Sequence, residues 1–154
     1  MNNLKIINLL NDQLINELIA SNQYFLNSII YKHLGYKKIA LKEKNESKEE
    51  LKHAKKILNR ILTLEGKPNI EILNKFIFSN NIEEILKNNL YFEKKIQKNL
   101  KKNILICEKK YDYITRILLE EILYDSIKHI KWIKFELNII NIIGIKDYLK
   151  IQIN

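Results

Sequence analysis

A glutamate and a histidine one helical turn apart, Glu50 and His53, are the residues of this sequence whose types and spacing most directly suggest chemistry. Residues three apart lie on the same face of a helix. A carboxylate oxygen and an imidazole nitrogen at that distance can bind one transition-metal ion together. Because Glu-x-x-His also occurs on ordinary surface helices, the pair indicates a metal site only if neighbouring helices bring further acids and a second histidine to the same depth.

The rest of the sequence predicts four long helices and a short fifth one. Apolar residues recur at spacings of three and four, as on one face of a helix, and 3 Gly and 1 Pro leave little material for the turns of an all-β fold. The segment 65–81 has no helical period and is too long for a tight turn, so we expect a crossover that leaves the second and third helices parallel. The helices are expected over residues 4–34, 38–64, 82–109, 111–143 and 145–153.

Each long helix carries an acid or a histidine among the apolar residues of its inner face. Glu17 interrupts the first helix, Glu93 the third and His129 the fourth, in addition to Glu50 and His53 on the second. A buried and unpaired carboxylate is costly, so these acids require a cation, a hydrogen-bond network or solvent. The four faces together predict a metal site in the bundle interior. On the fourth helix, the apolar positions expected in step with His129 are Ile114, Leu118, Ile122 and Ile133.

The net charge of +9 raises the question of nucleic-acid binding. Lysine outnumbers arginine 25 to 2, and 30 Ile and 20 Asn accompany it in a chain of 154 residues. Proteins that bind phosphate usually rely on arginine, whereas Ile, Lys and Asn together are typical of AT-rich coding sequence. The charge is therefore attributed to composition, and nucleic acid is not an expected partner.

A length of 154 residues suits a single domain over residues 1–154. The only cysteine, Cys107, excludes an intrachain disulfide and fits a reducing cytoplasm. We expect no signal peptide and no membrane-spanning segment, because apolar runs are only a few residues long. The apolar tail over 145–153 is expected to pack against another subunit.

The sequence resembles the bacterioferritins of the ferritin-like superfamily over essentially its whole length. In ferritin-like di-iron proteins, two helices each supply a Glu and the other two each supply Glu-x-x-His. The resemblance implies a ferritin-like four-helix bundle that oxidises Fe(II) with O₂ or H₂O₂ at a di-iron centre. It also implies storage of ferric mineral in a hollow shell of 24 subunits built from two-fold dimers. The segments that carry the resemblance are 14–26, 46–54, 60–69, 120–132 and 147–152.

The resemblance also implies roles for individual residues. Tyr24 would lie beside the di-iron centre, where a phenol can supply an electron. Glu17 and Glu93 would be terminal carboxylate ligands, and Glu50 would be the bridging carboxylate. His53 and His129 would be the imidazole ligands.

Two departures from the family pattern concern the cofactors. Ser126 stands where the second Glu-x-x-His has a bridging acid, and a neutral hydroxyl is at most a weak iron ligand. Asp125 and Glu121 point about 100° and 140° away from Ser126 on an ideal helix and do not replace it. Leu51 occupies the position of the haem-binding Met, and Met1 is the only Met in the chain, so haem is not expected.

Three functions remain compatible with the sequence. The first is an iron-storage subunit whose ferroxidase site is weakened by Ser126. The second is a catalytically inactive shell subunit that co-assembles with an active ferritin subunit. The third, a basic shell that covers DNA, rests on net charge alone and would show binding that weakens steeply with salt.

Overall fold

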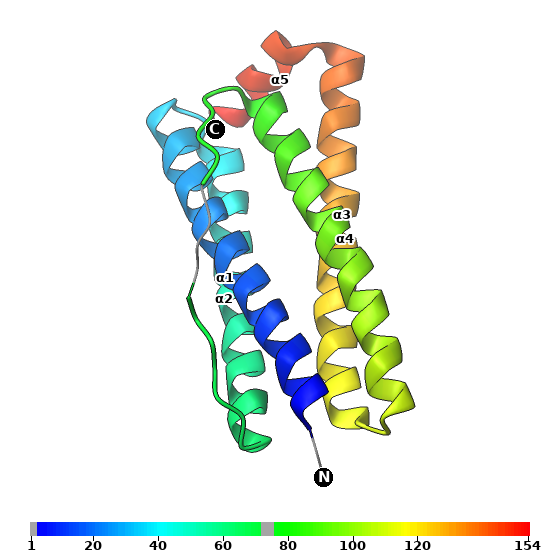
Figure 1. Cartoon of the computed structure of the whole chain (residues 1–154). Coiled ribbons are helices and arrows are strands. Elements are labelled where there is room, and N and C mark those ends of the chain that lie inside the picture. The colour runs from blue at the N-terminus through cyan, green and yellow to red at the C-terminus, as the bar shows by residue number, and fades with distance from the viewer. Residues whose placement is uncertain (1–2, 72–75) are drawn as a thin grey trace.

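The computed structural model describes residues 3–71 and 76–154 and consists almost entirely of helices (Figure 1). Within those residues there are five helices and no strand. The predicted all-α four-helix bundle with a short fifth helix is therefore confirmed. The helices are α1 Leu4–His33, α2 Lys37–Thr63, α3 Ile82–Lys109, α4 Tyr113–Ile143 and α5 Ile145–Gln152.

The connections set the direction of each helix. Tight turns join α1 to α2 and α3 to α4, so each of these pairs is antiparallel (Figure 1). The segments 64–71 and 76–81 lie along the side of α1 and α2 and lead to the opposite end of the bundle, so that α2 and α3 run parallel, as predicted. Residues 72–75 of the predicted crossover lie outside the described residues.

Two side-chain amides of α1 hold the crossover against the bundle. The amide of Asn11 donates to the Lys67 carbonyl at 3.1 Å and accepts from the Asn69 amide at 2.7 Å. Gln23 binds Ile77 in the same reciprocal way, with both distances 2.9 Å. Each amide thus satisfies a backbone donor and a backbone acceptor of an irregular segment that has no partner in regular structure.

Side-chain caps define where α3 and α4 begin. Asn81, the predicted cap of α3, accepts from the Glu84 amide at 3.0 Å. The predicted start of α4 at Tyr111 is wrong by two residues. Tyr111 has a φ of +58°, which a helix does not tolerate, and Asp112 caps the helix by accepting from the Thr115 amide at 3.0 Å.

The cap also explains why one predicted core position on α4 is wrong. Ile114 is 62% exposed, while Thr115 is buried. Arg60 on α2 donates to the Thr115 hydroxyl and to Asp112, both at 2.9 Å, and this draws Thr115 into the interior. The buried face of α4 therefore continues through Leu119 rather than through Leu118, which is half-buried.

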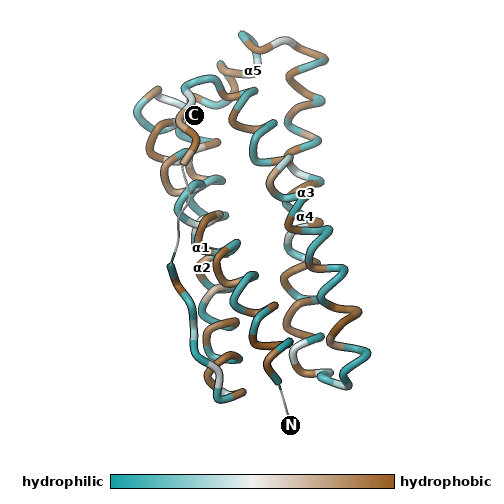
Figure 2. The backbone as a smooth tube through the Cα atoms, in the orientation of Figure 1, coloured by the Kyte–Doolittle hydropathy of each residue, from teal (hydrophilic) through white to brown (hydrophobic). Residues whose placement is uncertain are grey.

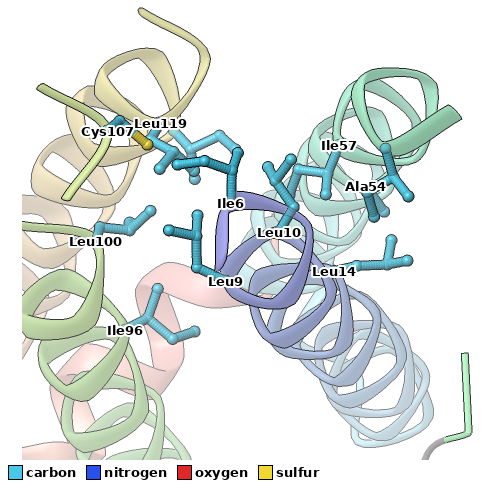
Figure 3. Packing of buried hydrophobic residues seen from close by; sticks show 12 residues of the cluster. Ile6, Leu9, Leu10, Leu14, Ala54, Ile57, Ile96, Leu100, Cys107 and Leu119 are labelled. Carbon is cyan, nitrogen blue, oxygen red and sulfur yellow. The ribbon is translucent and has the colours of Figure 1, made fainter. Parts of the chain in front are cut away.

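Two apolar clusters lie at opposite ends of the bundle. The first joins α1, α2, α3 and α4 near the α3–α4 turn, where side chains of α1 lie among those of the other helices (Figure 3). The second lies near α5. Along each long helix the buried acids and histidines fall between the two clusters. The fully buried members include Leu10, Ile57, Leu100 and Leu119 in the first cluster, and Tyr31, Leu86 and Ile133 in the second.

Brown and teal alternate along the long helices in Figure 2, as expected for amphipathic helices with one face inward. Among the described helices, none combines the length and the apolar character that crossing a membrane requires. The terminal helix α5 packs on its own bundle through Tyr148, which donates to Glu136, and through buried Gln152. Ile151 and Ile153 remain exposed, and packing of this tail against another subunit stays a prediction.

Candidate metal centre

The structure brings the sequence-predicted site residues together between the two apolar clusters. Every one of them is buried, and all four long helices contribute. α2 supplies two of them one turn apart, as the spacing predicted. The residues are Glu17 and Tyr24 from α1, Glu50 and His53 from α2, Glu93 from α3, and Ser126 and His129 from α4.

The first half of the site consists of Glu17, Glu50 and His53. His53 Nδ1 lies 3.4 Å from Glu50 Oε2 and 3.5 Å from Glu17 Oε2. One ligand atom from each residue lies within 4.8 Å of the others, which suits a single metal ion. The second oxygen of Glu17 accepts from the Gln13 amide at 2.9 Å, so this carboxylate is held in orientation.

Asp125 orients His53 from the opposite side. Its Oδ2 lies 2.8 Å from His53 Nε2, and its Oδ1 lies 3.4 Å from Lys128 Nζ. With Nε2 bound to Asp125, Nδ1 faces the two glutamates, an arrangement typical of metal-binding histidines. That Asp125 does not replace Ser126 as a ligand stays a prediction. Glu121 pairs with Lys56 at the surface instead.

The second half of the site is built around Glu93 and His129. Glu93 Oε1 lies 3.2 Å from His129 Nδ1 and accepts from the Tyr24 hydroxyl at 2.5 Å. Glu93 Oε2 accepts from the Ser126 hydroxyl at 2.8 Å. Ser126 therefore acts as a hydrogen-bond donor to a neighbouring acid, which is a different task from that of a bridging carboxylate.

Sequence reasoning missed one acid of this second half. Glu46 Oε2 lies 3.8 Å from His129 Nδ1, and Glu46, Glu50 and His129 each offer a ligand atom within 4.8 Å of the others. The sequence held a signal for it, because Glu46 precedes Glu50 by four residues and so shares its helix face.

Burial and charge shift the protonation of these groups. Burial, together with the charge of Glu17, raises the pKa of Glu50 well above its usual range. Burial lowers the pKa of His53, but Glu17 and Glu50 outweigh it and bring the pKa to about 11. Burial opposes ionisation of Glu93 as well, yet His129, Tyr24 and Ser126 together lower its pKa. Burial likewise works against the charged form of His129, and Glu93 raises its pKa in spite of it.

The buried donors fit a metal ion. Within the described part of the chain, Glu17 Oε2 and His129 Nε2 have no hydrogen-bond partner. Buried polar atoms are almost always paired, so an unpaired Glu17 Oε2 that lies 3.5 Å from His53 Nδ1 has an oxygen available for a metal ion. Carboxylate oxygens with imidazole nitrogens are suitable ligands for divalent iron.

Leu51 lies on the outer face of α2 and is 55% exposed. It borders an apolar hollow with Leu14, Leu18 and Leu58. A leucine offers no sulfur for axial ligation, and the absence of haem from this position stays a prediction.

We expect the metal-free protein to lose stability as the pH rises from 7 to 9. The folded pKa of His53, about 11, lies above the ordinary value of 6.5. The stabilisation by its proton is therefore complete below pH 6.5 and is lost toward pH 11. One such group lowers the unfolding free energy by at most about 1.4 kcal/mol per pH unit. Denaturant unfolding after chelator treatment measures it.

The variant His53→Gln should have a flatter dependence of stability on pH than the unmodified protein. His33→Gln, at an exposed histidine, is the matched control and should leave the slope unchanged. Equal slopes for the unmodified protein and His53→Gln would contradict the assignment of the proton to His53.

The chain is similar to known proteins over almost its whole length. The ferritin-like domain matches residues 7–143. Bacterioferritin of Brucella melitensis is 37% identical over 144 residues, which are 94% of this chain and 89% of that protein. Bacterioferritin of Mycobacterium leprae is 34% identical over 93% of this chain and 90% of its own length. Bacterial ferritin of Pseudomonas aeruginosa is 33% identical over 97% of both chains. The chain therefore belongs to the ferritin-like family and, within it, to the bacterioferritins.

Proposed function

We propose that this chain stores iron and oxidises Fe(II) at a two-metal centre inside the bundle. The observation that carries the proposal is the burial of Glu17, Glu50 and Glu93 in one cluster with His53 and His129. Acids at that depth need cations, and carboxylates with imidazoles suit iron. The relatives are named bacterioferritin, which supports iron storage.

Glu50 is the residue that would serve both metal ions. It belongs to one set of close ligand atoms with Glu17 and His53, and to another with His129. A carboxylate has two oxygens and can contact two ions at once. This double membership supports the bridging role of Glu50.

Tyr24 and Glu93 would control a proton beside the centre. Burial and the nearby Glu93 raise the pKa of Tyr24 well above its usual range, so the phenol keeps its proton. The phenol donates a hydrogen bond to Glu93. Bound iron would supply the electrons that reduce O₂ or H₂O₂. The role of the protein is to hold the ions, to orient Glu93 and to keep the phenolic proton on the oxygen of Tyr24.

Assembly into a shell is part of the proposal, with residues 1–154 as a single domain and two-fold dimers as the building unit of 24 subunits. The outer faces of α1 and α2 expose large apolar side chains that a second copy would cover, and this supports the dimer. They include Phe25, Ile29, Leu41 and Leu51, each more than half exposed.

A second candidate function is a structural subunit that has lost ferroxidase activity and co-assembles with an active ferritin subunit. The observation that favours it is Ser126, whose hydroxyl is already committed to Glu93. A neutral hydroxyl contributes no charge toward holding two divalent ions.

Addition of O₂ to the anaerobic, Fe(II)-loaded assembly should give rapid ferric-oxo absorbance, saturating near two irons per subunit. Glu50→Ala removes a ligand shared by both ions and should slow oxidation at least about 10-fold, the minimum typical of lost metal-site partners. Glu83→Ala is the matched control, since Glu83 is a partly exposed acid paired with Lys87 on α3. Stopped-flow absorbance with iron analysis measures both variants.

Oxidation no faster than in Glu50→Ala would contradict the ferroxidase proposal. If Ser126→Glu then brought rapid oxidation, the structural-subunit alternative would hold for the natural chain.

Replacement Tyr24→Phe removes the hydroxyl that donates to Glu93 at 2.5 Å. We expect oxidation to slow about 10-fold, with little change in the number of irons bound, because the ligand atoms remain. Tyr31→Phe is the control: Tyr31 is equally buried on α1, and its hydroxyl has no partner among the described residues. An equal effect of the two replacements would exclude a specific role for Tyr24.

A further inference from the structure

Ser126 leaves the second metal position short of negative charge. The remaining acids of the predicted ligand set are Glu17, Glu50 and Glu93. Three carboxylates do not neutralise two divalent ions, and the Ser126 hydroxyl is turned to Glu93 Oε2 at 2.8 Å. A further carboxylate within reach would remove the deficit.

Glu46 is such a carboxylate. It lies on α2 one turn before Glu50, on the same helix face. Its Oε2 is 3.8 Å from His129 Nδ1, and it forms with Glu50 and His129 a set of ligand atoms that are all within 4.8 Å of one another. This set combines two oxygens and one nitrogen, as the set around His53 does.

A ring of contacts holds Glu46 in this orientation. Lys42 Nζ binds Glu46 Oε1 at 2.9 Å and lies 5.0 Å from the centre of the Trp132 ring. The Trp132 ring stacks on His129, with centroids 6.2 Å apart and planes at 21°. Lys42 thus occupies one oxygen of Glu46 and leaves the other facing His129. Partners of this kind commonly orient a metal-ligating carboxylate.

The orientation of His129 supports a metal position beside Glu46. It is only 2% exposed, and Nε2 has no hydrogen-bond partner in the described part of the chain. Its other nitrogen faces both Glu93 and Glu46. Nδ1 therefore lies where it could bind an ion that Glu46 also contacts, and the stack on Trp132 holds the ring in this orientation.

The neighbouring acids make other hydrogen bonds, although the second oxygen of Glu43 has no partner among the described residues. Glu43 lies one turn before Glu46, but its Oε1 accepts from the amides of Asn27 at 2.9 Å and Asn89 at 2.7 Å. Asp125 is bound to His53 Nε2. Glu46 is the acid in this group whose second oxygen faces His129.

We propose that Glu46 is a metal ligand in this chain and replaces the acid that Ser126 lacks. The second metal position then lies among Glu46, Glu50 and His129, displaced along α2 toward the residues that precede Glu50. The inference rests on the proposed two-metal centre and adds a ligand to it.

Co(II) titration of the assembled, metal-free protein tests the inference, with calorimetry and Co(II) absorbance as readouts. The unmodified protein should bind two Co(II) per subunit, and Glu46→Gln should lose one or bind it at least about 10-fold more weakly. Ser126→Glu in the Glu46→Gln background should restore two. Glu83→Gln is the matched control and should bind two, because it breaks a comparable Lys–Glu pair far from the site.

Glu46→Asp separates ligation from charge. It keeps the charge but shortens the side chain by one C–C bond, about 1.5 Å. If Glu46 contacts the metal directly, Glu46→Asp should weaken the binding of Co(II). If Glu46 acts only through its charge, Co(II) binding should be unchanged. It also serves if Glu46→Gln does not fold. Unchanged binding in either folded variant, or one Co(II) in the unmodified protein, would overturn the role of Glu46. Absence of Co(II) binding altogether would overturn the proposed metal centre itself.

Discussion

Mutual repulsion among buried carboxylates is the constraint on which the rest of this structure depends. Glu17, Glu50 and Glu93 are each at most 6% exposed, and water does not screen them. Without metal, the protein relieves the repulsion with protons: Glu50 is held toward its neutral form, and His53 and His129 are held toward their charged forms. A metal ion relieves the same repulsion, so binding must displace these protons.

The rest of the fold keeps this polar cluster in a fixed geometry. Apolar clusters at both ends of the bundle supply the stabilisation that a row of buried charges cannot. Asn11 and Gln23 fasten the crossover, which allows α2 and α3 to run parallel and present their acids to a common interior. A metal centre within a bundle requires a rigid apolar frame that holds the polar ligands in the middle of the bundle.

Much of this arrangement could be predicted from the sequence, because helical periodicity reports which face points inward. The bounds of α3 were predicted to the residue, and every predicted ligand lies in the cluster. The start of α4 was missed because a positive φ at Tyr111 has no clear sequence signal. Glu46 was missed although its spacing from Glu50 was visible, since spacing alone does not distinguish an inward acid from a surface acid paired with lysine. The link between Asp125 and His53 depends on how α2 and α4 pack, which periodicity does not reveal.

The central claim is that the buried cluster binds two metal ions. Anomalous diffraction at the iron edge, from crystals of the anaerobic assembly loaded with Fe(II), tests it most directly. We expect two peaks inside each bundle, one at coordination distance from Glu17 and His53 and one at coordination distance from His129, with Glu50 contacting both. Iron peaks only on the surfaces of the bundle, with none beside Glu50, would contradict it.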